Sequence, residues 1–173
     1  MFTGSITRIT SGLMATLLLV TVHLAVPSPV VAADLAKGMA AYTIGDFETT
    51  FKEWLPLASA GDVNAQLYLG FMYADGQGVP QNYIHAATWT RRAAEQGDDR
   101  AQNNLGVMYE DGHGVPQDFV QAHMWYSLAI AQGNRRAIRN RNNLVPNMSS
   151  QAVSKAQALA RQCLASTYQD CGN

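Results

Sequence analysis

The sequence has few cysteines, little charge imbalance and only one long apolar run. Among its 173 residues are two cysteines, 12 Lys and Arg residues, and 13 Asp and Glu residues. Two cysteines are too few for a fold built on several disulfides. The near-balanced charge argues against a basic nucleic-acid-binding protein. An apolar fraction of 47% argues against a wholly disordered chain.

The sequence also lacks the motifs of several enzyme classes. Ser-x-x-Lys, Gly-x-Ser-x-Gly, a phosphate-binding Gly-x-x-x-x-Gly-Lys and the zinc motif His-Glu-x-x-His do not occur. The cysteines do not form Cys-x-x-Cys, the usual pattern of a redox pair. His85, His113 and His123 do not have the spacing of metal ligands. We therefore expect no metal, no cofactor and no enzymatic activity.

The long apolar run lies near the start of the chain. Leu13–Val26 is mostly apolar and follows a polar segment whose one cation is Arg8. Small residues up to Ala33 then resemble a cleavage site, so residues 1–33 are predicted to be a secretory signal and the protein to be exported, most simply to the periplasm. The alternative is an uncleaved anchor, but the run is shorter than the roughly 20 residues that span a membrane. No later run is long enough to span, and the remaining 140 residues suffice for one domain.

The chain after this leader repeats itself. Residues 61–96 and 97–132 align without a gap, and 18 of the 36 aligned positions are identical. Each copy has Gly-x-Gly-Val-Pro near its middle, and such glycine and proline residues predict a turn. The period predicts two successive helix–turn–helix units.

Each copy carries the start and stop signals of two helices. Asp62 and Asp98 are predicted to cap the first helix of each copy, and Asn82 and Asp118 the second. Gly97, like its equivalent one repeat later, is predicted to stop the second helix in a left-handed conformation.

Recurring apolar and small residues form the predicted core. Their spacing is that of one helix face. The mid-helix glycines that recur in both copies predict a helix crossing too close for a Cβ atom. The predicted core residues are Leu69, Gly70, Tyr73, Ala86, Trp89, Leu105, Gly106, Tyr109, Ala122 and Trp125.

Further units must flank the two copies, because a helix pair of this size buries its apolar face only against neighbours. Residues 34–60 are predicted to be a degenerate first unit, and residues 133–173 a degenerate last unit with a capping helix. The helices expected in these flanks are Leu35–Thr43, Phe47–Ser59, Asn134–Leu144 and a last helix capped by Ser149 that runs through Ala165.

The shared pattern LG.MY..G.GV.Q....A..W...A...G resembles the Sel1-like repeat, a relative of the tetratricopeptide repeat with a longer inter-helix loop. This resemblance implies an all-α fold, a right-handed α/α-solenoid of about four helix–turn–helix pairs. It also implies an adaptor that binds a protein or an extended peptide and has no catalytic residues. So short a stack could also form a homodimer by stacking end to end.

Positions that differ between the copies are candidates for partner binding. In tetratricopeptide-like solenoids, the first helix of each unit lines a concave groove. Such a groove would be apolar at its N-terminal end and basic at its C-terminal end, which suits a peptide with a hydrophobic residue and a carboxylate. The hypothesised groove residues are Asn64, Leu67, Phe71, Arg100, Asn103, Val107, Glu110, Arg136 and Arg139.

Two alternatives stand beside this groove hypothesis. The arginines at positions 135, 136, 139 and 141 spread around the helix axis, and such a charge run also fits a solvated face. Leu67 and Phe71 have a spacing that equally fits packing under the preceding unit.

Cys163 and Cys171 lie eight positions apart. Export permits a disulfide between them, which would tie the C-terminal tail to the last helix; the alternative is two free thiols. A short loop of this kind would stabilise the fold by roughly 2 kcal/mol.

Three functions remain open from the sequence. The leading one is a non-enzymatic periplasmic adaptor. The second is a weak hydrolase or penicillin-binding protein of the cysteine-rich Sel1-like type, against which stands the absence of a visible nucleophile–base pair. The third is a secreted effector or an immunity protein.

Overall fold

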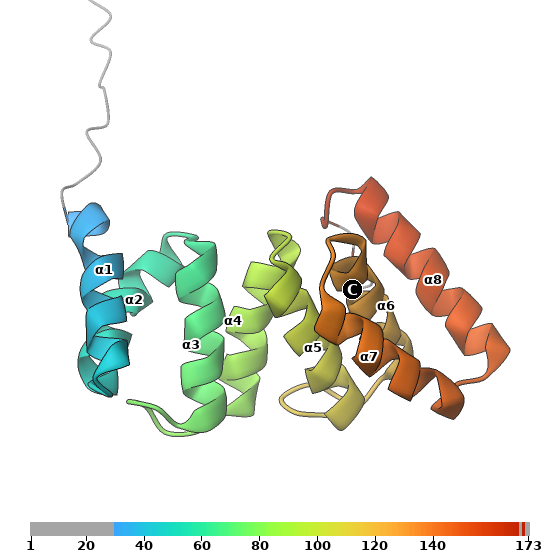
Figure 1. Ribbon diagram of the computed structural model, residues 1–173, viewed down its shortest axis with the longest axis horizontal. Coiled ribbons are helices and arrows are strands. Elements are labelled where there is room, and N and C mark those ends of the chain that lie inside the picture. Colours follow the sequence, from blue (N-terminus) through green and yellow to red (C-terminus); the bar gives the residue numbers. More distant parts are fainter. Residues whose placement is uncertain (1–29, 170, 172–173) are drawn as a thin grey trace, which may run out of the picture.

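The computed structural model describes residues 30–169 and residue 171, and over this part of the chain all regular structure is helical (Figure 1). The expected signal segment lies mostly outside these residues. No helix in the described part is long and apolar enough to cross a membrane. The helices are α1 Val30–Thr43, α2 Phe47–Ser59, α3 Val63–Asp75, α4 Tyr83–Glu95, α5 Asp99–Asp111, α6 Phe119–Ala131, α7 Arg135–Leu144 and α8 Ser150–Ala165, with a short 3₁₀ turn at Val145–Asn147.

The helices form a row of stacked pairs. The pairs α1 with α2, α3 with α4, and α5 with α6 lie side by side along the molecule (Figure 1). Each pair also packs on the next, through α2 with α3 and α4 with α5. The fold is therefore the predicted α/α-solenoid, with α3, α5 and α7 as the first helices of successive units.

The helix ends are fixed by the predicted caps. The carboxylate of Asp62 accepts a hydrogen bond from the backbone N–H of Ala65 at 2.8 Å, and Asp98 does the same one repeat later. Asn82 and Asp118 cap α4 and α6 in the same way. These bonds satisfy N–H groups that no helical carbonyl can reach. The sequence therefore locates these helix starts, whereas α1 begins five residues before its predicted start at Leu35.

Two glycines of the second repeat stand where a Cβ atom would clash with a neighbouring residue. A Cβ atom on Gly106 would lie 2.5 Å from the ring of Tyr126, so α5 and α6 cross too closely for any larger residue. A Cβ atom on Gly114 would lie 1.9 Å from the carbonyl oxygen of Tyr83. The turn of the second repeat therefore rests on the start of α4, and the turn of the first repeat rests in the same way on Phe47 at the start of α2.

The predicted core is mostly buried, with three corrections. Leu69, Leu105 and Trp125 are fully buried, but Tyr73, Trp89 and Tyr109 are only partly buried. The difference between the two tryptophans comes from their neighbours. Trp125 belongs to a cluster completed by Cys163 and Ala160 of α8, whereas the guanidinium of Arg92 lies 4.6 Å from the ring of Trp89.

The C-terminal end departs from the regular repeat. Helix α8 packs mainly on α6 and closes that end of the stack (Figure 1). A disulfide joins Cys163 of α8 to Cys171. The tail between them turns back, with the backbone N–H of Tyr168 donating to the carbonyl oxygen of Cys163 at 2.9 Å. The ring of Tyr168 comes to rest beside Gly97, at the end of the first repeat.

Candidate partner-binding groove

An open cavity of about 550 Å³ runs across the first helices of three successive units. We call it the A-helix groove, where A helix means the first helix of a unit. Residues of α3 form one wall, the first two turns of α5 form its floor, and the start of α7 forms the other wall. It is lined by Leu67, Tyr68, Phe71, Asp99, Arg100, Asn103, Asn104, Gly133, Asn134, Arg135 and Arg136.

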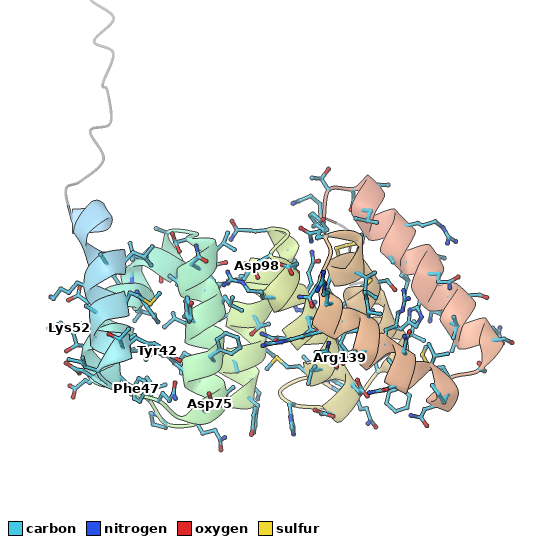
Figure 2. All side chains as sticks on the ribbon, in the orientation of Figure 1. Tyr42, Phe47, Lys52, Asp75, Asp98 and Arg139 are labelled. Atoms are coloured by element: carbon cyan, nitrogen blue, oxygen red, sulfur yellow. A yellow bond between two sulfur atoms is a disulfide. The ribbon has the colours of Figure 1, made fainter. Side chains whose placement is uncertain are left out.

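The predicted groove residues divide between this cavity and its surroundings. Five of them line it: Leu67, Phe71, Arg100, Asn103 and Arg136. Val107 lines a neighbouring cavity instead. Asn64, Glu110 and Arg139 line neither of the two, and Arg139 stands further along α7 (Figure 2).

Two predicted contact residues are buried. Leu67 is 1% exposed and belongs to the buried cluster that includes Ala101 and Leu105 of the next unit. Asn103 is 6% exposed and accepts a hydrogen bond from the side-chain amide of Asn140 at 3.0 Å. Leu67 is therefore covered, but by the following unit and not, as the alternative expected, by the preceding one, whose cluster holds Ala65, Leu69 and Met72 of α3 instead. The accessible apolar surface of the groove comes from Tyr68 and Phe71.

Sequence comparison of the two copies missed Tyr68, Asp99, Asn104 and Arg135. Each of these residues stands next in the sequence to a residue that was predicted to line the groove. The groove is therefore wider than the single row of side chains expected on each helix, and it includes the start of α7. The signal that could have found Tyr68 and Asn104 is the same one used for their neighbours: they occupy equivalent positions that differ between the copies.

Polar side chains link each first helix to the next. A guanidinium N–H of Arg100 donates to the side-chain oxygen of Asn64 at 2.9 Å. The side-chain amide of Asn134 donates to the carboxylate of Asp99, also at 2.9 Å. Arg100 additionally pairs with Asp98, whose hydrogen bond raises the pKa of the guanidinium. Arg100 is thus held by the fold and is less available to a partner.

The other groove arginines are different. Arg135, Arg136 and Arg139 are exposed, and no ion pair among the described residues includes them. Arg141, in contrast, points to the opposite side of α7, where it donates to the hydroxyl of Ser127 at 3.5 Å. Two unpaired cations, Arg135 and Arg136, therefore line the C-terminal end of the groove, with Arg139 beyond them on α7, while Arg141 belongs to another face.

Glu110 was predicted to face the groove, but it bonds to another side chain of the protein instead. Its carboxylate accepts a hydrogen bond from the hydroxyl of Tyr126 at 2.5 Å. Burial, followed by this bond, raises the pKa of Tyr126 well above its usual value. Glu110 therefore holds a buried tyrosine in place.

A serine and a histidine that the sequence did not pair lie close together. The hydroxyl of Ser127 is 3.3 Å from Nδ1 of His123. That hydroxyl, however, also bonds to the backbone carbonyl of His123 at 2.8 Å, which is common for serine within a helix. His123 is 2% exposed, and the cation of Arg141 acts on the pair, donating to the hydroxyl of Ser127. In the part of the chain that the structure describes, no ion pair or hydrogen bond joins His123 to a carboxylate, the group that orients the base in a catalytic triad.

The Sel1 repeat model matches residues 63–98 and 99–134. No curated protein matches the chain at a significant level.

Two solved structures are similar over most of the chain. One is a protective antigen of uropathogenic Escherichia coli strains that displays an SLR fold, with 28% identity and a TM-score of 0.73 over 78% of this chain. This chain spans 31% of that protein's length. The other is a Sel1 repeat protein from Oxalobacter formigenes, with 33% identity and a TM-score of 0.53, over 64% of this chain and 98% of that one. The chain therefore belongs to the Sel1 repeat family.

Proposed function

We propose that this protein is an exported, non-enzymatic adaptor that binds an extended segment of a partner protein in the A-helix groove. The Sel1-repeat solenoid is a fold typical of protein interaction, which supports the general class. The observation that carries the proposal is the groove itself: an open cavity across three units, with aromatic side chains on one wall and unpaired arginines on the other.

The charge of the groove indicates the chemistry of the segment. Arg135 and Arg136 line the cavity, and Arg139 stands one turn further along α7. Guanidinium groups bind carboxylates through paired hydrogen bonds. Tyr68 and Phe71 on the opposite wall offer an apolar contact. The segment would therefore carry acidic and apolar side chains.

Export is supported by the sequence of residues 1–33, with its apolar run and small residues before Asp34. The mass of the protein recovered from the periplasm of its native cell tests this part. We expect a chain that begins at Asp34. A mass that matches the full chain in the membrane fraction would contradict it.

Affinity capture from the periplasm tests the groove. The groove variant is Arg136→Glu/Arg139→Glu, and its matched control is Lys155→Glu/Arg161→Glu, which reverses two exposed cations on α8. We expect one partner to be captured by the wild type and by the control but not by the groove variant, with the helical circular dichroism of all three alike.

Two results would contradict the proposal. Equal capture by all three proteins would place the partner on another surface. Capture of no partner by any of them, at concentrations where the fold is intact, would argue against an adaptor.

A further inference from the structure

A second cavity lies beside the groove, where the two repeats differ in one buried side chain. It has a volume of about 190 Å³ and lies between α3, α4 and α5. Thr90 of α4 lines it, and the equivalent residue 36 positions later is Tyr126. We call this cavity the Thr90 socket. Its lining residues are Gly70, Phe71, Ala74, Tyr83, Thr90, Asn104, Val107, Met108 and His113.

One repeat later, a side chain of the protein itself takes the equivalent place. Tyr126 is fully buried, lies against Gly106, and donates its hydroxyl proton to Glu110. It packs in one cluster with Ala137 and Leu144 of α7. The repeat therefore forms a place for a tyrosine ring between three helices, and the second repeat fills it.

The first repeat leaves that place open. Thr90 lies against Gly70, as Tyr126 lies against Gly106, but its side chain ends at the hydroxyl. Ala74 stands where Glu110 stands in the second repeat. The socket thus lacks both the ring and the group that holds its hydroxyl, and its walls are mainly apolar.

The socket is continuous with the A-helix groove. Phe71 and Asn104 line both cavities. At its far end, the ring of Tyr83 stacks on His113 with 4.7 Å between ring centres and 14° between planes. A segment that crosses the groove beside Arg135 and Arg136 would therefore pass the opening of the socket.

We propose that the Thr90 socket receives a tyrosine or phenylalanine side chain of the bound segment, next to carboxylates that meet the groove arginines. The ring would take the place that Tyr126 takes in the second repeat. Charge complementarity selects the acidic neighbours, and the apolar walls select the ring. This inference rests on the proposed function and names the class of segment: acidic, with one aromatic anchor.

The test uses synthetic peptides and one variant in which two residues of the first repeat are replaced by their equivalents from the second. The probe is a fluorescein-labelled Gly-Ser-Asp-Glu-Tyr-Glu-Asp-Ser-Gly peptide, with matched peptides that carry Ala for Tyr, or Asn and Gln for the acidic residues. The variant is Thr90→Tyr/Ala74→Glu, which would fill the socket from within. Fluorescence anisotropy gives the affinities.

We expect the Tyr peptide to bind the wild type at least about tenfold more tightly than the Ala peptide, as the truncation of a buried aromatic anchor usually gives. The filled variant should bind both peptides equally weakly. Replacing the acidic residues, or using Arg135→Glu/Arg136→Glu, should weaken binding of the Tyr peptide. A methyl-labelled sample provides a second measurement, because the Tyr peptide should shift the signals of Val107 and Met108.

Several outcomes would overturn the socket. Equal binding of the Tyr and Ala peptides would leave charge alone as the determinant. Binding of p-cresol as tightly as the peptide would identify a site for a small aromatic molecule. If the filled variant still captures the periplasmic partner while Arg136→Glu/Arg139→Glu does not, the adaptor stands and the socket is wrong.

Discussion

The ring of Tyr126 limits residue 106 to glycine. The ring of Tyr126 occupies the space that any side chain at position 106 would need. We expect Gly106→Ala to lower the free energy of unfolding by about 1–3 kcal/mol, as overpacking of a core usually does. The gain in helix propensity, about 1 kcal/mol, offsets part of the strain. Chemical denaturation measures the change.

A double-mutant cycle provides the control for this pair. Tyr126→Thr, which copies Thr90, removes the ring that the new methyl group would meet. We expect Gly106→Ala to be less destabilising in the Tyr126→Thr background than in the wild type. Equal effects in both backgrounds would show that the ring is not the cause.

His123 makes the stability of the fold depend on pH. Burial lowers the pKa of His123, and the nearby charge of Arg141 lowers it further. The unfolded chain, in which the histidine pKa is about 6.5, therefore binds a proton more readily than the folded protein. Stability is retained above that value and is lost as the pH falls below it. We expect the free energy of unfolding to decrease between pH 7.5 and pH 5.

Two histidine variants separate this effect from other titrating groups. His123→Ala copies Ala87 of the first repeat and should flatten the pH dependence over this range. His85→Gln copies Gln121 of the second repeat and is the matched control at an exposed histidine. An unchanged slope in His123→Ala would assign the effect to another group.

At the scale of helices, the sequence predicts most boundaries correctly because the signals are local. The caps of α3 to α8 are side chains within three residues of the N–H groups they satisfy. The packing of α8 on α6 could not be read in this way. It depends on which apolar surface is left open after α7, and the sequence alone does not rank those surfaces.

The prediction that Leu67 is exposed in the groove was wrong for a related reason. Leu67 lies on the face of α3 that was predicted to be open, and only the position of α5 shows that the face is covered. Arg135, Arg136 and Arg141 are close in the sequence, yet helix geometry sends Arg141 to the other side. Periodicity predicts which residues share a face, but a contact between units decides whether that face meets solvent.

The disulfide is expected to stabilise the end of the molecule that α8 closes. Cys163 and Cys171 are both buried in the cluster that includes Trp125. We expect dithiothreitol to lower the free energy of unfolding by about 2 kcal/mol, the value for a short closed loop. Cys171→Ala should unfold identically with and without reductant. A wild type insensitive to reductant would contradict the stabilising role.

At the scale of the whole molecule, stability should differ between the two ends. A solenoid is held by contacts between neighbouring units, so a terminal unit has support on one side only. The α1–α2 pair has α3 as its neighbour. At the other end, α6 contacts α7 and α8, and the disulfide fixes the tail over the same cluster. Among the helices that the structure describes, the α1–α2 pair is therefore less supported than the C-terminal end.

We expect hydrogen–deuterium exchange followed by mass spectrometry to show this difference. Amides of α1 and α2 should exchange faster than those of α5 and α6, because local opening of a terminal unit exposes less apolar surface than opening within the stack. Reduction of the disulfide should speed exchange in α8 and leave α1 and α2 unchanged, since α8 packs mainly on α6, whereas α1 and α2 pack on each other and on α3. Equal protection of all units would mean that the chain opens only as a whole. A ligand bound across α3, α5 and α7 would then protect every helix equally, rather than the three units that line the groove.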